Sequence, residues 1–275
     1  MSLRIALQAM QDKGLERLDA QILLLHALGQ STNDRAWLMS HDTDELTPAQ
    51  QQTLDGFIQR RLAGEPVAYI VGSKEFFGLS LAVNADVLVP RPDTECLVEW
   101  ALEVIPTSQT PAVLDLGTGS GAIGLAIKFA RSQAEVTLVD ASQTALAVAC
   151  GNATSLGLTI HGLQSNWFEN VPSEQRFDLI VSNPPYIADG DSHLAALEHE
   201  PLMALTSGSD GLTAIRRIVQ DAPRFLKSGG WLLLEHGYDQ AAAVRQLLTL
   251  QGFSSVASRL DLNGIERCSG GVFLS

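Results

Sequence analysis

Residues 112–130 read AVLDLGTGSGAIGLAIKFA, and this stretch decides the fold class of the chain. A short apolar run over 112–117 enters a glycine-rich turn, and an apolar helical pattern follows over 122–130. Glycines at such a turn allow a tight backbone and let a ligand approach the main chain. The stretch therefore predicts the first strand and helix of a parallel α/β sheet, with a ligand site at the turn.

The same alternation of strands and helices continues to the end of the chain. Strands that alternate with helices form a parallel sheet that is covered on both faces. We predict a seven-stranded, doubly wound, Rossmann-like sheet. Besides the first strand and helix, the pattern predicts strands over 135–140, 177–182, 230–237, 253–258 and 271–275, a strand just before Trp167, and helices over 144–156, 211–226 and 239–250.

The first part of the chain has a helical character. Apolar residues recur at helical spacing over 3–10 and again over 18–28. Thr47 and Pro48 predict the cap and first turn of a third helix, which runs to Gly64. We expect a small helical bundle here.

A different pattern follows the helical region. Residues 67–71 alternate between apolar and small or polar side chains, and residues 79–83 do the same, which predicts a β-hairpin. We therefore expect a helical domain over 1–64, a β-hairpin linker over 65–90 and the α/β domain over 91–275.

The composition excludes several classes of protein. Of the 275 residues, 45% are hydrophobic and only 18% are charged, so the chain is not mostly disordered. A net charge of −13 makes broad contact with a nucleic-acid backbone unfavourable, although a local basic patch would still allow it. No apolar run approaches the roughly 20 residues that cross a bilayer. The 3 cysteines are far apart, which fits a reduced cytoplasmic protein.

Acidic residues flank the glycine turn. Asp115 stands just before the first glycine, where a carboxylate suits a cationic ligand group. Asp140 ends the second strand, where it can accept hydrogen bonds from both hydroxyls of a ribose. Gly119, Gly121 and Gly124 also satisfy G-x-G-x-x-G, the fingerprint of a dinucleotide site. The turn leaves both a nicotinamide dinucleotide and S-adenosylmethionine (SAM) open, and Asp115 favours SAM.

An Asn-Pro-Pro-Tyr motif, residues 183–186, follows a later strand. A planar NH2 group is a weak nucleophile because its lone pair is delocalised. Two acceptors on its hydrogens would align it with a methyl sulfonium and stabilise the charge that develops on nitrogen. The Asn183 side-chain oxygen and the Pro184 carbonyl can be those acceptors, and Tyr186 can stack on a flat amide or base. The motif predicts methyl transfer to a planar nitrogen and favours SAM.

Several segments together resemble one family. DLGTGSGAIG (115–124) and FDLIVSNPPYI (177–187) are similar to the amino-methyltransferases that carry an N-P-P-Y motif. The similarity narrows to the HemK-type family, also called PrmC, and covers essentially the whole chain. The segments that narrow it are PVAYIVGSKEFFGLSLAVNADVLVPRPDTE (66–95), HEPLMALTSGSDGL (199–212) and GGWLLLEHG (229–237).

This resemblance implies a fold, an activity and a set of site residues. The family has a class I SAM-dependent methyltransferase domain and methylates the amide nitrogen (N5) of the glutamine in the Gly-Gly-Gln motif of bacterial peptide chain release factors, which modulates translation termination. The N-terminal helical domain would recognise the protein substrate. The substrate-binding residues would be Asn183, Pro184, Pro185 and Tyr186, of which Asn183 and Pro184 are catalytic. SAM would contact Asp115, Gly117, Thr118, Gly119, Ser120, Gly121, Asp140, Trp167 and Asn183.

Other functions stay open on the residues alone. An adenine-N6 methyltransferase for DNA or RNA would use the same N-P-P-Y chemistry, but neither half of the chain is basic. A nicotinamide-dependent dehydrogenase fits only the glycine fingerprint. A SAM-binding adaptor would not need the N-P-P-Y motif.

Some polar residues receive no catalytic role at this stage. Thr94 and Glu95 open a predicted helix over 92–105, where they cap the helix or lie over the active site. No metal site is predicted, because the cluster at 198–200 lacks further partners at ligand spacing. We interpret that cluster and His236 as structural.

Overall fold

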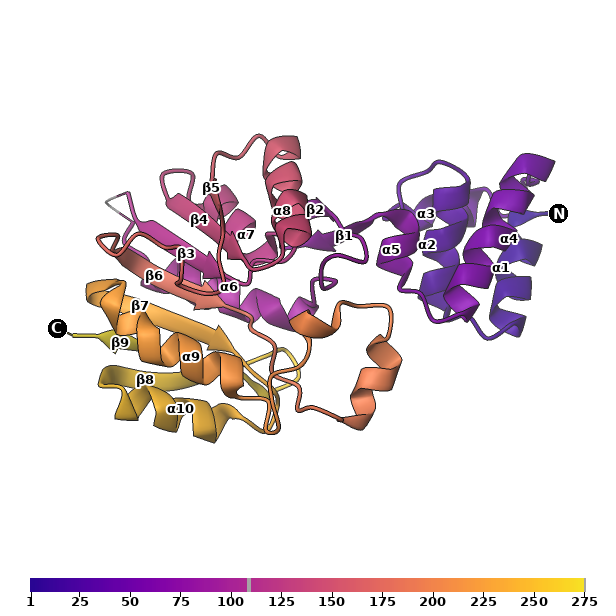
Figure 1. The fold of residues 1–275 in the computed structure, drawn as a ribbon. Helices are drawn as coiled ribbons and strands as arrows, with labels where there is room; N and C mark the ends of the chain where they lie inside the picture. Colours follow the sequence, from indigo (N-terminus) through magenta and orange to yellow (C-terminus); the bar gives the residue numbers. More distant parts are fainter. Residues whose placement is uncertain (108–109, 275) are drawn as a thin grey trace. The chain divides into compact units, whose positions relative to one another are not determined.

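The structure, a computed structural model, describes residues 1–107 and 110–274. The chain divides into two compact units, Met1–Ser73 and Lys74–Ser275. The first unit is helical, and the second contains the sheets (Figure 1). Within the described ranges, no helix is long and apolar enough to span a membrane.

Amphipathic helices build the first unit. Their apolar faces meet in a core that includes Leu24, Leu54 and Ile58. The predicted start of the third helix is confirmed, because Thr47 accepts a hydrogen bond from the Gln50 backbone at 3.3 Å and Pro48 opens the first turn. The helices are α1 (Leu3–Asp12), α2 (Arg17–Ala27), α3 (Arg35–Ser40), α4 (Pro48–Leu62) and α5 (Val67–Val71).

The prediction of a strand over 67–71 is wrong, because these residues form α5. Ala68, Tyr69 and Ile70 are buried in succession, whereas a strand would bury alternate side chains. The helix starts after Pro66 and ends at Gly72, whose φ of 75° is the left-handed cap conformation. Five residues are too few to separate a period of 2 from one of 3.6, so the flanking proline and glycine were the better signals.

The β-hairpin exists but is shorter than predicted. Its strands are β1 (Ser73–Phe76) and β2 (Leu79–Ala82). The two connecting residues, Phe77 and Gly78, have φ values of 50° and 76°. Positive φ at both positions is what a two-residue type I′ turn requires.

A seven-stranded sheet organises the second unit, as predicted. The strand order is β5-β4-β3-β6-β7-β9-β8, in which β5 to β7 run parallel and β9 is antiparallel to both its neighbours. β9 starts before the predicted residue 271, and Ser275, the last residue of that predicted strand, lies outside the described residues. The strands are β3 (Ala112–Leu116), β4 (Glu135–Asp140), β5 (His161–Gln164), β6 (Phe177–Ser182), β7 (Leu226–Glu235), β8 (Phe253–Leu260) and β9 (Glu266–Phe273).

Helices cover both faces of this sheet (Figure 1). One face packs on α6 (Glu95–Val104), α7 (Ala122–Ala130) and α8 (Gln143–Ser155), and the other on α9 (Thr213–Asp221) and α10 (Ala241–Leu250). The short 3-10 helices are η1 (Pro92–Thr94), η2 (Ser192–Leu197), η3 (Leu202–Ala204) and η4 (Ala222–Arg224).

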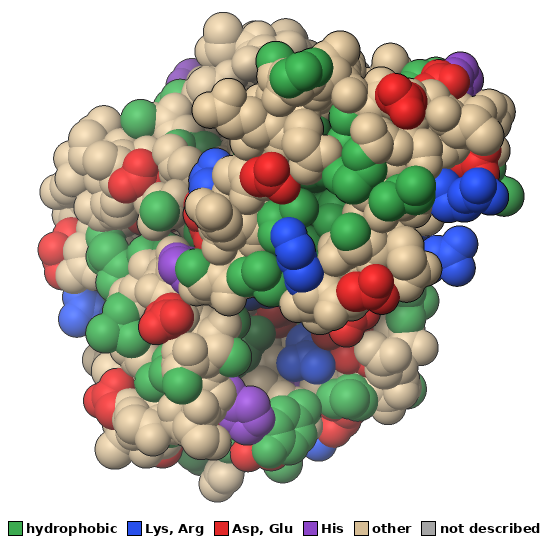
Figure 2. Space-filling view, turned by 90° about the vertical axis from the view of Figure 1, so that its right-hand side faces the viewer, with side chains coloured by type: hydrophobic (Ala, Val, Ile, Leu, Met, Phe, Trp, Pro, Cys, Tyr) green, Lys and Arg blue, Asp and Glu red, His purple; other side chains and the backbone are tan. Residues whose placement is uncertain are grey.

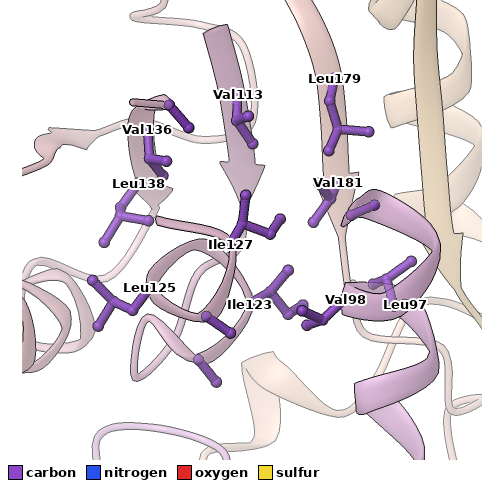
Figure 3. Close-up of a cluster of buried hydrophobic side chains, with 14 of the residues drawn as sticks. Leu97, Val98, Val113, Ile123, Leu125, Ile127, Val136, Leu138, Leu179 and Val181 are labelled. Carbon is purple, nitrogen blue, oxygen red and sulfur yellow. The ribbon is translucent and has the colours of Figure 1, made fainter. Parts of the chain in front are cut away.

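Successive side chains of each strand point to opposite faces of the sheet, so the sheet separates two hydrophobic cores. Val113, Leu179 and Val181 point toward α6 and α7, as Figure 3 shows, while Leu114 and Ile180 enter the core on the opposite face. Chain order reverses between β3 and β6, since β4 and β5 lie on one side of β3 and β6 and β7 on the other. Open α/β sheets bind ligands at the carboxyl ends of the strands beside such a reversal. The glycine turn and the Asn-Pro-Pro-Tyr motif both lie there.

Candidate active site

A cavity of about 240 Å³ lies at the carboxyl ends of β3, β4 and β6. It brings together most of the residues predicted for the site from four separate segments. Further walls come from residues 86–94, before α6, and from 201–204, around η3. The predicted residues that line the cavity are Gly117, Thr118, Gly119, Ser120, Asp140, Trp167, Asn183 and Pro185. Asp115, Gly121, Pro184 and Tyr186 do not line it.

Two glycines of this segment are explained by their surroundings, one by close packing in α7 and one by its backbone conformation in the turn. A Cβ atom on Gly124 would lie 2.3 Å from Cδ2 of Leu138 and 3.0 Å from Oδ2 of Asp115, so this glycine brings α7 close to β3 and β4. Gly117 has a φ of 69°, in the left-handed region that favours glycine, and a Cβ there would only reach ordinary van der Waals contact, 3.4 Å, with the Trp167 ring. Trp167 itself has a positive φ of 53° and lies beside the start of the turn.

Asp115 lies beneath the glycine turn and is fully buried. Its Oδ2 accepts hydrogen bonds from the Thr118 hydroxyl at 2.7 Å and from the Gly124 backbone at 2.9 Å. Burial raises the pKa of this carboxyl to about 6. Oδ1 has no hydrogen-bond partner among residues 1–107 and 110–274. A buried carboxylate oxygen without a partner fits the cationic amino group of SAM.

Asp140 is held at the cavity by the backbone around it. Its Oδ2 accepts a hydrogen bond from Gly119 and its Oδ1 accepts one from Ser142, each at 2.9 Å. Burial raises the pKa of this carboxyl, and the backbone N–H groups oppose that shift. Each oxygen keeps a further lone pair, so the fixed carboxylate can accept hydrogen bonds from ribose hydroxyls.

The Asn-Pro-Pro-Tyr motif turns one amide toward the cavity. Asn183 lines the cavity, and its Nδ2 donates a hydrogen bond to the Thr94 hydroxyl at 3.3 Å. The side chain of Pro184 is buried beneath the loop. The Tyr186 hydroxyl donates to Oε1 of Glu235 at 3.4 Å, and the burial of Tyr186 raises its pKa well above the usual range. The Thr94 hydroxyl therefore connects the start of α6 to the Asn-Pro-Pro-Tyr motif.

Sequence reasoning missed two residues that support the motif. Glu235 ends β7, and Gln240 donates a hydrogen bond from Nε2 to the Tyr186 carbonyl at 3.0 Å. Gln240 also accepts a hydrogen bond from the Gly237 backbone at 2.9 Å. The available signal was a glutamate at the end of an apolar strand, because burial of a carboxylate is costly unless specific partners stabilise it.

The residues interpreted as structural have partners. The Glu200 carboxylate pairs with Arg91 and accepts a hydrogen bond from the Val89 backbone at 3.2 Å, which ties two cavity walls together. His236 is buried, with its ring nitrogens 2.9 Å from the Gly237 carbonyl and 2.7 Å from the Ser269 hydroxyl. In the part of the chain that the structure describes, no group of three or more His, Cys, Asp or Glu could hold a metal ion.

Two family models match the chain. The model described as "PrmC N-terminal domain" matches residues 2–72, and the model described as "Methyltransferase small domain" matches residues 97–208. A "Release factor glutamine methyltransferase" from Bordetella pertussis is 53% identical over 262 residues, which cover 94% of this chain and 96% of that protein. The protein of the same description from Escherichia coli K12 is 43% identical over 274 residues, covering 98% and 97%.

The chain belongs to the release factor glutamine methyltransferase family. The predicted HemK-type resemblance is thereby confirmed, and so is the prediction of a SAM-dependent methyltransferase. The fold is shared more widely. The 16S rRNA N2 G1207 methyltransferase of T. thermophilus, solved with AdoMet and guanosine, has a TM-score of 0.55 at 22% identity, over 73% of this chain and 49% of that one.

Side chains of both charge signs are mixed on the surface of the molecule. On the face drawn in Figure 2, Lys and Arg side chains are interspersed with acidic and apolar ones and do not merge into one broad basic surface. The net charge of −13 agrees with this picture. Contact with a long polyanionic backbone is therefore unfavourable.

Proposed function

We propose that this protein transfers a methyl group from SAM to the side-chain amide nitrogen of the glutamine in the Gly-Gly-Gln motif of bacterial peptide chain release factors, in the cytoplasm. The family membership supports the reaction. The observation that carries the proposal is the Asn183 side chain at the cavity, beside the glycine turn, with its NH2 group engaged by Thr94.

That engagement leaves the Asn183 oxygen for the substrate. Because Nδ2 donates to Thr94, Oδ1 is the end of the amide that is available to accept a hydrogen bond from a substrate NH2 group. The Pro184 carbonyl would accept the second hydrogen. The two acceptors would orient the nitrogen and stabilise its developing positive charge, and the product would lose its proton to water.

The cofactor side of the proposal uses the rest of the cavity. SAM supplies an electrophilic methyl group on a sulfonium. The Asp115 carboxylate, buried beneath the glycine turn, would attract its cationic amino group, and Asp140 would accept hydrogen bonds from its ribose hydroxyls. Trp167 would cover the adenine ring. The backbone from Gly117 to Gly121 would approach the cofactor closely, since side chains are absent or small there.

The domain roles belong to the same proposal. Residues 1–64 would recognise the protein substrate, residues 65–90 would link the parts and residues 91–275 would carry the reaction. The division of the structure into the units Met1–Ser73 and Lys74–Ser275 supports a separate N-terminal domain. Its own apolar core, around Leu24 and Leu54, allows it to fold as a unit.

Mass spectrometry of unmethylated release factor, incubated with the protein and SAM, tests the proposal. A gain of one methyl group on the glutamine of the Gly-Gly-Gln peptide is expected. Genomic DNA in a parallel reaction is the control. Methyl transfer to adenine in the DNA, with none to the release factor, would overturn the proposed substrate and keep the chemistry of the Asn-Pro-Pro-Tyr motif.

A further inference from the structure

Two cysteines that are distant in sequence lie side by side where α6 packs against the sheet. Cys96 is the second residue of α6, and Cys268 lies on β9. Their Sγ atoms are 3.0 Å apart, although 172 positions separate the two residues in the chain. Both are free thiols. The two sulfurs therefore lie within about 1 Å of the separation that a disulfide bond requires.

The two thiols differ in their access to solvent. Cys96 is partly exposed, whereas Cys268 is 0% exposed. The hydrogen bond with Cys96 and the burial of the side chain both raise the pKa of the Cys268 thiol above its usual range. A reactant from solvent therefore meets Cys96 first, and Cys268 is placed to react with a group that forms on Cys96.

A positive charge lies beside this pair of thiols. The register of β8 and β9 places Arg259 directly opposite Cys268, so both side chains lie on the same face of the sheet. The Arg259 guanidinium is 4.9 Å from the centre of the Trp100 ring, and Trp100 lies one helical turn after Cys96. The pKa of Arg259 is raised, mainly by its hydrogen bonds to Glu103 and to a smaller degree by the two cysteines. A guanidinium in this place favours the thiolate, the reactive form of cysteine.

We propose that Cys96 and Cys268 form a peroxide-responsive thiol pair, in which hydrogen peroxide oxidises Cys96 and Cys268 then closes a disulfide between α6 and β9. This inference goes beyond the proposed function, and its tests need neither SAM nor a methyl acceptor. Helix α6 begins directly after Thr94, whose hydroxyl meets the Asn183 amide. The disulfide would therefore tie the start of this helix, next to the cavity, to the sheet.

The reaction consumes one peroxide for each disulfide. The Cys96 thiolate attacks a peroxide oxygen, the O–O bond breaks, and the leaving hydroxide takes up the thiol proton as water. The Cys268 sulfur then attacks the sulfenic acid on Cys96, so that an S–S bond forms and the S–O bond breaks. The second hydroxide leaves as water with the Cys268 proton. The two thiols lose two electrons in total, and one hydrogen peroxide is reduced to two waters.

The remaining cysteine, Cys150, is too far away to take part within one molecule. It lies on α8 beside β5, since a Cβ on Gly162 would be 2.8 Å from its Sγ. β5 is five strand positions away from β9, which corresponds to roughly 24 Å at the usual spacing of strands. Cys150 is partly exposed, as Cys96 is, so it provides the matched control.

Oxidation with one equivalent of hydrogen peroxide tests the pair. In Cys150→Ser, which keeps only the two thiols of the pair, the number of thiols measured after denaturation should fall from two to none. Mass spectrometry of the non-reduced digest, in this variant and in wild type, should find Cys96 joined to Cys268 with the loss of two hydrogen atoms. Dithiothreitol should restore both thiols. A disulfide that contains Cys150, or one that joins two molecules, would overturn the proposal.

Single variants separate the roles of the two thiols. With excess peroxide, Cys96 in Cys268→Ser has no neighbouring thiol and should continue to sulfinic acid, at least about 10-fold more than in wild type. In Cys96→Ser, which changes the partly exposed member of the pair, the buried Cys268 should remain a reduced thiol. Equal amounts of Cys96 sulfinic acid in wild type and Cys268→Ser, or ready oxidation of Cys268 in Cys96→Ser, would contradict the assigned roles.

Thermal unfolding measures the effect of the cross-link on the native fold. A disulfide across 172 positions restricts the unfolded chain, so oxidised Cys150→Ser should have a Tm about 5–15 °C above that of its reduced form. Peroxide should leave the Tm of Cys96→Ser unchanged. A lower Tm in the cross-linked protein would also overturn the proposal, because the bond would then form only by distorting the native arrangement of α6 and β9.

Discussion

The cavity has two sides that are built in different ways. The cofactor side consists of residues 115–124 and Asp140, which are close in sequence and lie at the carboxyl ends of the adjacent strands β3 and β4. The acceptor side consists of Thr94, Asn183, Tyr186, Glu235 and Gln240, which span most of the second unit. One side is organised by local backbone geometry, and the other depends on the register between β6 and β7.

This difference predicts that the two sides fail in different ways. Changes on the cofactor side should weaken SAM binding or the folding of the turn. Changes on the acceptor side should leave SAM bound and reduce the rate of transfer, because they disturb interactions that matter only when the nitrogen attacks the methyl group.

The largest effect is expected for Asn183→Ala. Removing the acceptor oxygen should lower kcat by about 10²- to 10³-fold, the usual cost of deleting one group that stabilises developing charge. Steady-state kinetics with release factor and calorimetric titration of SAM would measure the two quantities separately. Equal losses of kcat and of SAM affinity would mean that Asn183 shapes the cofactor pocket. That outcome would remove the distinction between the two sides of the cavity.

The next effect is expected for Asp140→Ala on the cofactor side. The change removes a carboxylate that is fixed by the Gly119 and Ser142 backbones. Hydrogen bonds to charged groups contribute about 1.5–3 kcal/mol, so the dissociation constant for SAM should rise about 10- to 100-fold. Asp178→Ala is the control, since Asp178 pairs with Lys227 at the start of β6 and not at its carboxyl end. Unchanged SAM binding in Asp140→Ala would contradict the assignment of the ribose site.

The same contrast explains what could be predicted from the sequence. The glycine turn and the alternating strands are local patterns, so the sheet, its two covered faces and the cofactor side could all be expected. The short helix over Val67–Val71 could not, because its five residues fit both periods. Glu235 and Gln240 were missed because only strand pairing brings them to a motif some 50 residues earlier in the chain. Thr94 was noticed but had no role until its partners were known.

Gly124→Ala tests whether the third glycine of the turn serves packing rather than the cofactor. The new Cβ would lie 2.3 Å from Leu138, and overpacking of this kind costs about 1–3 kcal/mol of unfolding free energy. Chemical denaturation would measure that loss. Gly151→Ala in α8 is the matched control, because nothing lies within 4 Å of its Cβ, and it should be neutral or stabilise the protein by up to about 1 kcal/mol. Equal stability of both variants would show that α7 adjusts without cost.

The smallest effect is expected for Gln240→Ala, on the acceptor side. This change removes the hydrogen bond to the Tyr186 carbonyl and leaves the Gly237 N–H without its side-chain acceptor. One neutral hydrogen bond contributes about 1 kcal/mol, so kcat should fall only about 5-fold, with unchanged SAM affinity. Gln251→Ala, at the other end of α10, removes a bond to the Gln220 carbonyl far from the motif and should leave kcat unchanged. If Gln240→Ala instead weakened SAM binding, the support of the Asn-Pro-Pro-Tyr loop and the cofactor site would be coupled, and the two sides of the cavity would have to be treated as one.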